Sequence, residues 1–286
     1  MNGRKLTWPL TFVLFAALAV SLFPVFWIVS TAIKPPTDWN ASPAIWFPAQ
    51  PTFINFRTLF DPDAIRAYGV GGVSQAATAS VLGSLLASIV STILSVAIGL
   101  FAAIGISRYG NGSKATPLII LSGRMFPPAA IAVPFVIIYS NVGLIDTYRG
   151  LIAIYVAGTL PFSTWMLKSF VDDLPREIEE AAMIDGRSRL MAHLAVTIPL
   201  IRGGLLATTL FIFILNWSEF MFALVLSYSN VTTIPVQLAR YVTATAGTLY
   251  GVQAALAVLA MVPLVIAGLF IQSHLARGMT FGAIKR

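Results

Sequence analysis

The chain has 286 residues, of which 57% are hydrophobic and 10% charged, and it carries a formal net charge of +7 without any cysteine. Soluble domains average roughly 45 to 50% apolar and about 25% charged residues, so a chain of this composition cannot hide its apolar surface by folding in water. Its Lys and Arg residues are scattered through short loops, which argues against nucleic-acid binding. The lack of cysteine excludes disulfides, thiolate metal sites and cysteine nucleophiles.

The first apolar run, at 9–33, follows Arg4 and Lys5. About 20 apolar residues cross a hydrocarbon core of about 30 Å. The run is longer than the apolar region of a signal peptide and lacks a small-residue cleavage site, so we expect a retained first span. Further spans are predicted at 77–107, 117–140, 150–168, 203–226 and 251–275. The sequence predicts an all-α integral membrane protein with six transmembrane helices in one domain, 1–286.

The distribution of basic residues predicts the orientation of these spans. With a cytoplasmic N-terminus, twelve basic residues lie inside and five outside. The inside residues are Arg4, Lys5, Arg108, Lys114, Lys168, Arg176, Arg187, Arg189, Arg202, Arg277, Lys285 and Arg286. The outside residues are Lys34, Arg57, Arg66, Arg149 and Arg240. Both termini are therefore expected to be cytoplasmic.

The extracytoplasmic loop 34–76 is rich in proline and in aromatic residues such as Trp39 and Trp46. Proline removes a backbone donor and breaks helices, so an irregular structure is expected. Because Trp is stable at the boundary between membrane and water, the composition favours an aromatic belt along the outer interface. A ligand site is the alternative.

Small residues recur at intervals of three or four along the second predicted span. At about 100° per residue they lie on one face of a helix. They are Ser80, Ser84, Ser88, Ser91, Ser95 and Gly99. Such faces let membrane helices approach closely, so the pattern favours a packing interface over a pore-facing stripe. In the third span, Pro127 and Pro128 are expected to kink or interrupt the helix, and Arg124 is expected to extend toward the cytoplasmic surface.

The cytoplasmic loop 169–200 is the most charged part of the chain. Asp172 and Asp173 suit the positive end of a helix, and Pro175 suits its first turn. Gly186 can adopt the left-handed conformation that ends a helix. The loop is therefore predicted to begin with a short helix that ends at Gly186.

A second helix is expected from about Arg187 to Thr197, stopping before Pro199, so that the loop forms a helical hairpin. Its first helix would present Ile178, Ala181 and Ala182 on one stripe. Two alanines leave a shallow surface that suits insertion into a cleft of another chain. A solvated hairpin without a partner is the alternative.

The fifth predicted span contains Glu219, with Asn216 and Thr209 on nearly the same helical face. Intramembrane acids are rare and usually face a bundle interior or a watery cavity, which favours a polar lining of a substrate path. Alternatively, Glu219 extends to the outer surface or pairs with a neighbouring helix.

No metal site is predicted, because His193 and His274 lie on cytoplasmic surfaces without a second ligand at a suitable spacing. No nucleophile elbow or phosphate-binding glycine loop is present either. An enzyme embedded in the membrane, with Glu219 as general acid or base, is an alternative that lacks a second catalytic group.

The pattern Glu180-Ala181-Ala182, Asp185-Gly186 and Ile198-Pro199, before the penultimate span, resembles the EAA loop of permease subunits in binding-protein-dependent ABC importers. Segments along the whole chain resemble the carbohydrate subfamily, in particular its maltose-permease-like second subunit. They are Pro51–Phe56, Phe126–Pro128, Gly143–Thr147, Asn216–Phe220 and Arg277–Lys285. Arg187 departs from the family pattern, which more often has a small residue there, and is expected to alter how the turn packs against its partner.

This resemblance implies a type I ABC importer permease fold in the cytoplasmic (inner) membrane of a prokaryote. The chain would form half of a path for a sugar, oligosaccharide or polyol, with a glycerol-phosphate-type solute as the alternative cargo. Its implied partners are a second homologous permease subunit, an ATPase dimer and an extracytoplasmic solute-binding protein.

The resemblance also implies which residues couple transport to ATP hydrolysis. The coupling residues would be Glu180, Ala181, Ala182, Asp185 and Gly186. The cytoplasmic tail 276–286 would reach toward the ATPase. ATP and Mg would bind that partner, because this chain has no Walker motif and is expected to hold no cofactor.

Overall fold

The computed structural model describes residues 8–61, 63–64, 76–110, 115–123, 127–243 and 247–282. These residues are predominantly helical, which confirms the all-α prediction; strands β1 (Val242–Thr243) and β2 (Gly247–Thr248) form a short antiparallel pair. The chain divides into two compact units. The first comprises Met1–Thr78 and Gln237–Val262, and the second comprises Ala79–Val236 and Pro263–Arg286.

The first unit begins with the apolar helix α1 (Trp8–Ala32), whose side chains are buried only at its C-terminal end. The following segment is largely irregular, as its prolines predict; it contains the short helices η1 (Pro36–Asp38) and α2 (Ile54–Leu59), and residues 63–64 are again helical. Rings of this segment pack on α1: the ring centroids of Trp46 and Trp27 are 6.1 Å apart.

Asn55 explains why the motif Pro51–Phe56 has a structural role in this unit. Its Nδ2 donates to the carbonyl oxygens of Ala32 and Lys34 at 2.9 and 2.8 Å, which satisfies the C-terminal end of α1. The Lys34 ammonium is buried and lies 4.0 Å from the centroid of the Trp27 ring. Burial lowers the pKa of Lys34, and nearby Asp38 opposes this shift.

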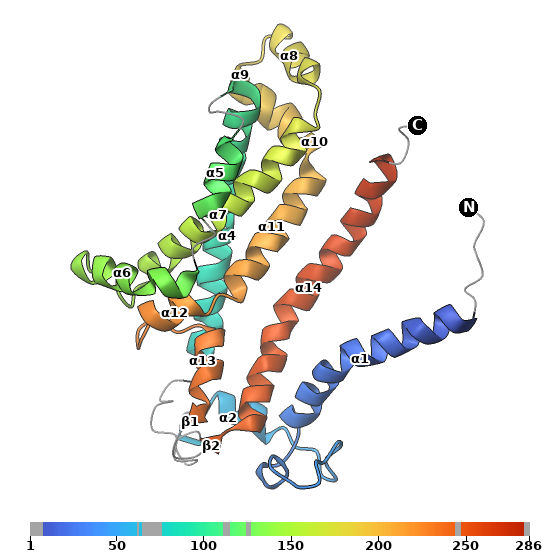
Figure 1. Cartoon of the computed structure of the whole chain (residues 1–286), viewed down its shortest axis with the longest axis vertical. Helices are drawn as coiled ribbons and strands as arrows, with labels where there is room; N and C mark the ends of the chain where they lie inside the picture. Colours follow the sequence, from blue (N-terminus) through green and yellow to red (C-terminus); the bar gives the residue numbers. More distant parts are fainter. Residues whose placement is uncertain are drawn as a thin grey trace. The chain divides into compact units, whose positions relative to one another are not determined.

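The second unit is built on three long helices, α4 (Ala77–Tyr109), α7 (Tyr148–Asp172) and α11 (Arg202–Trp217), which run alongside one another (Figure 1). Their apolar side chains share one core. Its buried members are Val96, Leu100, Ala103, Ile104, Leu167, Val171, Ile201 and Ile212.

The Ser91–Gly99 part of the small-residue face of α4 packs against α7, which confirms the predicted packing interface. Ser95 Oγ lies 2.8 Å from Thr159 Oγ1, and Ser163 Oγ donates to the Ser95 carbonyl at 2.8 Å. A Cβ added at Gly99 would lie 2.2 Å from Ser163 Oγ. The helices approach so closely there that only glycine fits.

Two predicted spans are interrupted. The third consists of α5 (Thr116–Ser122) and α6 (Pro128–Asn141), and the predicted role of Arg124 lies outside the described residues. The fifth consists of α11 and α12 (Met221–Leu226), with Glu219 in the break between them. The prediction of a continuous helix through Glu219 is therefore wrong. The Glu219 carboxylate instead accepts from backbone N–H groups in the first turn of α12.

Within the described residues, four helices are long and apolar enough to cross a membrane: α1, α4, α7 and residues Tyr250–Phe270 of α14 (Tyr250–Gly282). A fifth candidate is the pair Arg189–Leu200 and Arg202–Trp217, which is bent by 79°. Helix α6 is apolar but short, and α13 (Ile234–Arg240) has only seven residues. The described residues thus give four candidate spans, or five with the bent pair, so the predicted count of six is not matched exactly.

Candidate functional site

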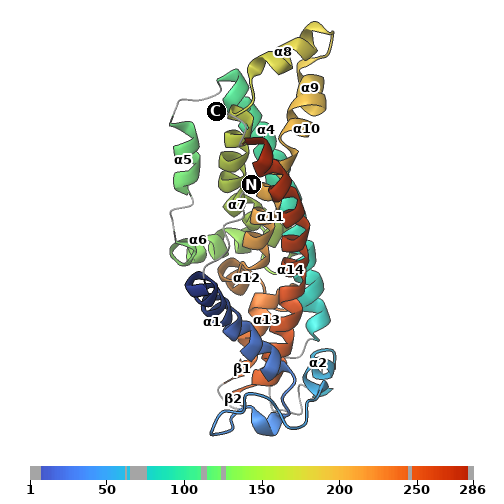
Figure 2. The same cartoon turned by 90° about the vertical axis from the view of Figure 1, so that its right-hand side faces the viewer.

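Helix α8 (Arg176–Ile184) lies beyond the ends of α4 and α7 in both views (Figures 1 and 2). Pro175 was predicted in its first turn and instead is the N-cap residue directly before it; the acids of the first turn are Glu177 and Glu179. Asp172 and Asp173 do not belong to its start. They end α7, where Asp172 pairs with Lys168 one turn earlier.

Gly186 ends α8 in the left-handed conformation, with a φ of 89°. Its N–H donates to the Met183 carbonyl at 3.0 Å, and the N–H of Arg187 donates to the Ala182 carbonyl at 3.2 Å. These two bonds form a Schellman motif, which satisfies the last carbonyls of the helix. The predicted end of the helix is confirmed.

The second arm of the hairpin is longer than predicted. It runs through α9 (Arg189–Ala192), the π-helical turn η3 (His193–Thr197) and α10 (Ile198–Leu200). The prediction that it stops before Pro199 is wrong. Proline has no N–H to donate, and the wider turn, in which the Ile198 N–H bonds to the His193 carbonyl, accommodates it.

The exposed face of α8 is apolar at its end. Ile184 is 86% exposed and Met183 beside it is exposed; Ile178, in the first turn of the helix, is also exposed. Four of the five predicted coupling residues, Glu180, Ala181, Asp185 and Gly186, are also exposed. The fifth, Ala182, is buried and faces into the hairpin, so the predicted stripe of Ile178, Ala181 and Ala182 is wrong at Ala182.

A buried ion pair holds α8 to the end of α4. The side chains of Arg108 and Glu179 are each 6% exposed, and Arg108 Nε donates to both carboxylate oxygens at 2.8 and 3.0 Å. The other end of the guanidinium donates to the carbonyls of Val171 and Leu174 at the end of α7. Removal of one partner from a buried pair typically costs about 3 to 5 kcal/mol.

Thr197, His193 and Tyr109 extend this pair into a network. Thr197 Oγ1 donates to Glu179 Oε1 at 2.7 Å. His193 Nδ1 lies 3.1 Å from Thr197 Oγ1, and its Nε2 lies 2.7 Å from the Tyr109 hydroxyl. We call these three residues, with Arg108 and Glu179, the α8 anchor. The sequence does not predict this anchor, since nothing in the spacing of these residues indicates that they meet.

The three predicted substrate-path residues make separate contacts. Asn216 is buried and donates from Nδ2 to Thr92 Oγ1 of α4 at 3.2 Å, while Thr209 bonds within its own helix to the Leu205 carbonyl. The carboxylate of Glu219 accepts from the N–H groups of Phe222 and Ala223 at 3.2 Å each, in the first turn of α12. No side-chain cluster joins the three among the contacts described.

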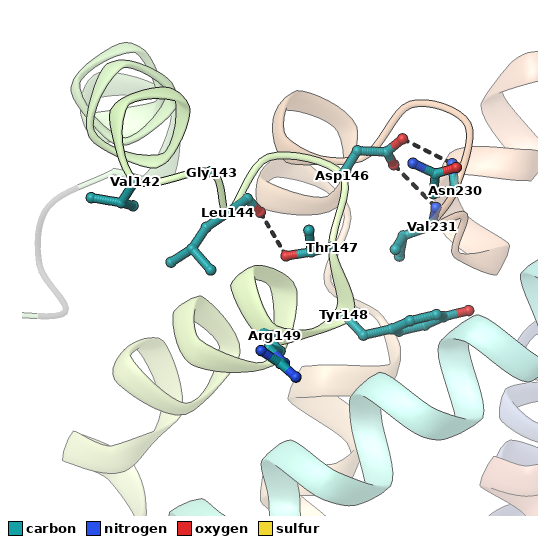
Figure 3. A pocket seen from close by; sticks show the side chains of 9 residues that line it. All are labelled: Val142, Gly143, Leu144, Asp146, Thr147, Tyr148, Arg149, Asn230 and Val231. Atoms are coloured by element: carbon teal, nitrogen blue, oxygen red, sulfur yellow. Dashed lines mark hydrogen bonds between the residues drawn. The ribbon is translucent and has the colours of Figure 1, made fainter.

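Asp146 forms a second polar centre that sequence analysis missed (Figure 3). Its carboxylate accepts from four consecutive backbone N–H groups, those of residues 228–231, at 2.8 to 3.0 Å. Burial alone would raise the pKa of Asp146, but these four hydrogen bonds lower it to about 2. The carboxylate ties the segment Gly143–Thr147 to the connection between α12 and α13.

The described residues contain no group of three His, Asp or Glu side chains that could hold a metal ion. His193 is engaged by Tyr109 and Thr197. The side chain of His274 lies outside the described residues.

Residues 95–281 match the family described as the binding-protein-dependent transport system inner membrane component. The chain belongs to this family. The matched region contains the whole hairpin and the α8 anchor. The chain is thus an ABC transporter permease, a multi-pass membrane subunit, and not an enzyme.

Similar proteins cover almost the whole chain. It is 32% identical to the trehalose/maltose transport system permease protein MalG of Thermococcus litoralis, over 93% of this chain and 92% of that protein. It is 31% identical to the sulfoquinovosyl glycerol transport system permease protein SmoH of Agrobacterium fabrum, over 97% and 94% of the two chains.

A solved structure shares the fold. It is the crystal structure of a bacterial ABC transporter involved in the import of the acidic polysaccharide alginate, with a TM-score of 0.72 and 18% identity. The match covers 92% of this chain and 94% of that chain. This likeness confirms the type I importer permease fold that the sequence predicted.

Proposed function

We propose that this permease forms half of the translocation path of an ATP-driven importer for a sugar, oligosaccharide or polyol. The observation that carries the proposal is the exposed apolar end of α8, centred on Ile184, which a buried ion pair holds at the ends of α4 and α7. Apolar side chains gathered on an exposed surface mark sites of protein interaction. Relatives named for trehalose/maltose and for sulfoquinovosyl glycerol support the class of cargo.

The partners in this proposal are a second homologous permease subunit, an ATPase dimer and an extracytoplasmic solute-binding protein. Helix α8 would insert into a cleft of one ATPase subunit, with Glu180, Ala181 and Asp185 at its exposed side. ATP and Mg would bind the ATPase. Closure of the ATPase dimer would displace α8 and switch the path between inward-facing and outward-facing states.

Thr209, Asn216 and Glu219 are proposed to lie along the path. Thr209 and Glu219 are only half-buried, which leaves their polar atoms within reach of a polyhydroxylated solute. A glycerol-phosphate-type anion is the alternative cargo. Binding of radiolabelled maltose and glycerol 3-phosphate to the cognate solute-binding protein separates the two classes directly.

The test of coupling is Gly186→Ala, with Gly203→Ala as its matched control. Alanine in the left-handed conformation costs about 1 to 2 kcal/mol, so the end of α8 should be distorted and the surface around Asp185 displaced. Gly203 lies in helix α11, and a Cβ there has no neighbour within 4 Å. Co-purification of the ATPase and uptake of solute into proteoliposomes are measured for both variants.

We expect Gly186→Ala to lose most of the uptake or of the bound ATPase, while Gly203→Ala retains both. Wild-type uptake and a full complement of ATPase in the Gly186→Ala importer would contradict docking through α8.

A further inference from the structure

The α8 anchor joins elements that are far apart in the sequence at one point. Arg108 and Tyr109 come from the end of α4, and Glu179 comes from α8. His193 and Thr197 come from the π-helical turn in the other arm of the hairpin. Both arms of the loop are therefore fastened to the same end of the same long helix.

The charges of the anchor oppose any separation of α8 from α4. Arg108 and Glu179 are almost completely removed from solvent. A buried charge that loses its partner is strongly unfavourable, so α8 cannot tilt away from α4 without exposing or isolating this pair. The same guanidinium also holds the last carbonyls of α7.

The hydrogen bonds of the anchor have one consistent direction. Thr197 has a single hydroxyl proton and donates it to Glu179, so its oxygen accepts from Nδ1 of His193. With the proton on Nδ1, the other ring nitrogen accepts from the Tyr109 hydroxyl. One tautomer of His193 thus satisfies every link from Tyr109 to the carboxylate, and such chains polarise and strengthen one another.

Ile201 marks the point where motion of the hairpin could be lost. The second arm of the loop meets α11 there at a bend of 79°. A sharp bend between two helices is where small backbone rotations absorb a displacement. A hairpin that was held only through this bend would swing without moving the long helices.

We propose that Thr197, His193 and Tyr109 are positioning residues for energy coupling, which lock α8 to α4. Displacement of α8 by the ATPase is then carried into α4 and, through its close contact at Gly99, into α7. This inference rests on the proposed docking of α8. It adds that import per ATP hydrolysed depends on a hydrogen-bonded chain buried inside this subunit.

The test uses the complete importer in proteoliposomes, with Thr197→Val and Thr197→Ser compared with the wild type. Valine keeps the shape of threonine and removes the hydroxyl, whereas serine keeps the hydroxyl and removes the methyl group. Import and ATP hydrolysis are measured in the same vesicles, together with the amount of bound ATPase and the KM for ATP. Tyr109→Phe is a second variant that removes only the outermost hydrogen bond and retains the ring.

We expect Thr197→Val and Tyr109→Phe to hydrolyse ATP with an unchanged KM but to import about fivefold less solute per ATP, within the usual range of coupling between sites. Thr197→Ser should retain wild-type coupling. A wild-type import ratio in Thr197→Val would overturn the inference. If Thr197→Val fails to assemble, a wild-type ratio in Tyr109→Phe overturns it instead. Failure of the proposed function is distinguishable, since the wild-type importer itself would then show no ATP-dependent import.

Discussion

The backbone conformation of Asp146 places its charged carboxylate where it can accept hydrogen bonds. It has a positive φ of 55°, which aspartate tolerates better than most residues that carry a Cβ. The turn directs its carboxylate toward four backbone N–H groups of the connection between α12 and α13. Figure 3 shows the bonds to Asn230 and Val231. The motif Gly143–Thr147 served above only as a mark of the family. In the structure it joins the connection between α6 and α7 to the connection between α12 and α13.

This contact predicts a specific dependence of stability on pH. The pKa of Asp146 is about 2 in the folded protein, below the ordinary value of 3.8. A carboxyl with a lowered pKa stabilises the folded state fully above its unfolded pKa, and this contribution is lost as the pH falls from about 4 to about 2. Asp146→Asn should lower the free energy of unfolding at pH 7 by about 1 to 2 kcal/mol, a range that allows for solvent screening.

Thermal unfolding of the detergent-purified protein at pH 7 and at pH 2.5 measures this effect. The difference between wild type and Asp146→Asn should be large at pH 7 and small at pH 2.5. Asp173→Asn, at the exposed end of α7, controls for the loss of one negative charge. Equal destabilisation by Asp146→Asn at both pH values would contradict an origin in the ionised carboxylate.

At the scale of helices, the spacing of small residues along α4 correctly predicted a packing contact, which is the one with α7. The spacing of Ser80 to Gly99 placed small groups on one side of a helix. The Ser91–Gly99 part of that side approaches α7, and Ser84 accepts from the N–H of Ile234 at the start of α13. Sequence could identify this face because every residue in it belongs to one continuous helix with a known rotation per residue.

Gly99→Ala should destabilise this contact by about 1 to 3 kcal/mol, because the added Cβ would lie 2.2 Å from Ser163 Oγ. The double variant Gly99→Ala/Ser163→Gly should recover part of the loss, since it removes the atoms that clash. The measurement is the apparent melting temperature in detergent. Gly268→Ala serves as control, because a Cβ at Gly268 in α14 has no neighbour within 4 Å. Additive destabilisation in the double variant would mean that the two residues do not clash.

Other elements could not be predicted from spacing along one helix. Glu179 meets Arg108 across 71 positions of sequence, and nothing local distinguishes it from the exposed Glu180 beside it. The π-helical turn before Pro199 depends on tertiary contacts of His193 and Thr197 that override the usual effect of proline. Glu219 was predicted within a helix because the hydropathy of 203–226 is continuous, although the chain begins a new helix at Met221.

At the scale of the whole molecule, the family and the fold were predictable because they follow from long apolar runs and one spaced motif. The orientation in the membrane is a separate property. It rests on the twelve basic residues counted inside and the five counted outside. Because the chain has no cysteine, single cysteines introduced at chosen positions provide a direct measurement of orientation.

We predict that Ala44→Cys reacts with a membrane-impermeant maleimide in intact cells, whereas Met191→Cys reacts only after the cells are permeabilised. Both positions are exposed, Ala44 in the loop that follows α1 and Met191 in α9 of the hairpin, so their intrinsic access to reagent is comparable. The cysteine-free wild type sets the background. Labelling of Met191→Cys in intact cells would place α8 on the outside, where it could not reach an ATPase. This experiment therefore tests the predicted orientation and the proposed docking of α8 at the same time.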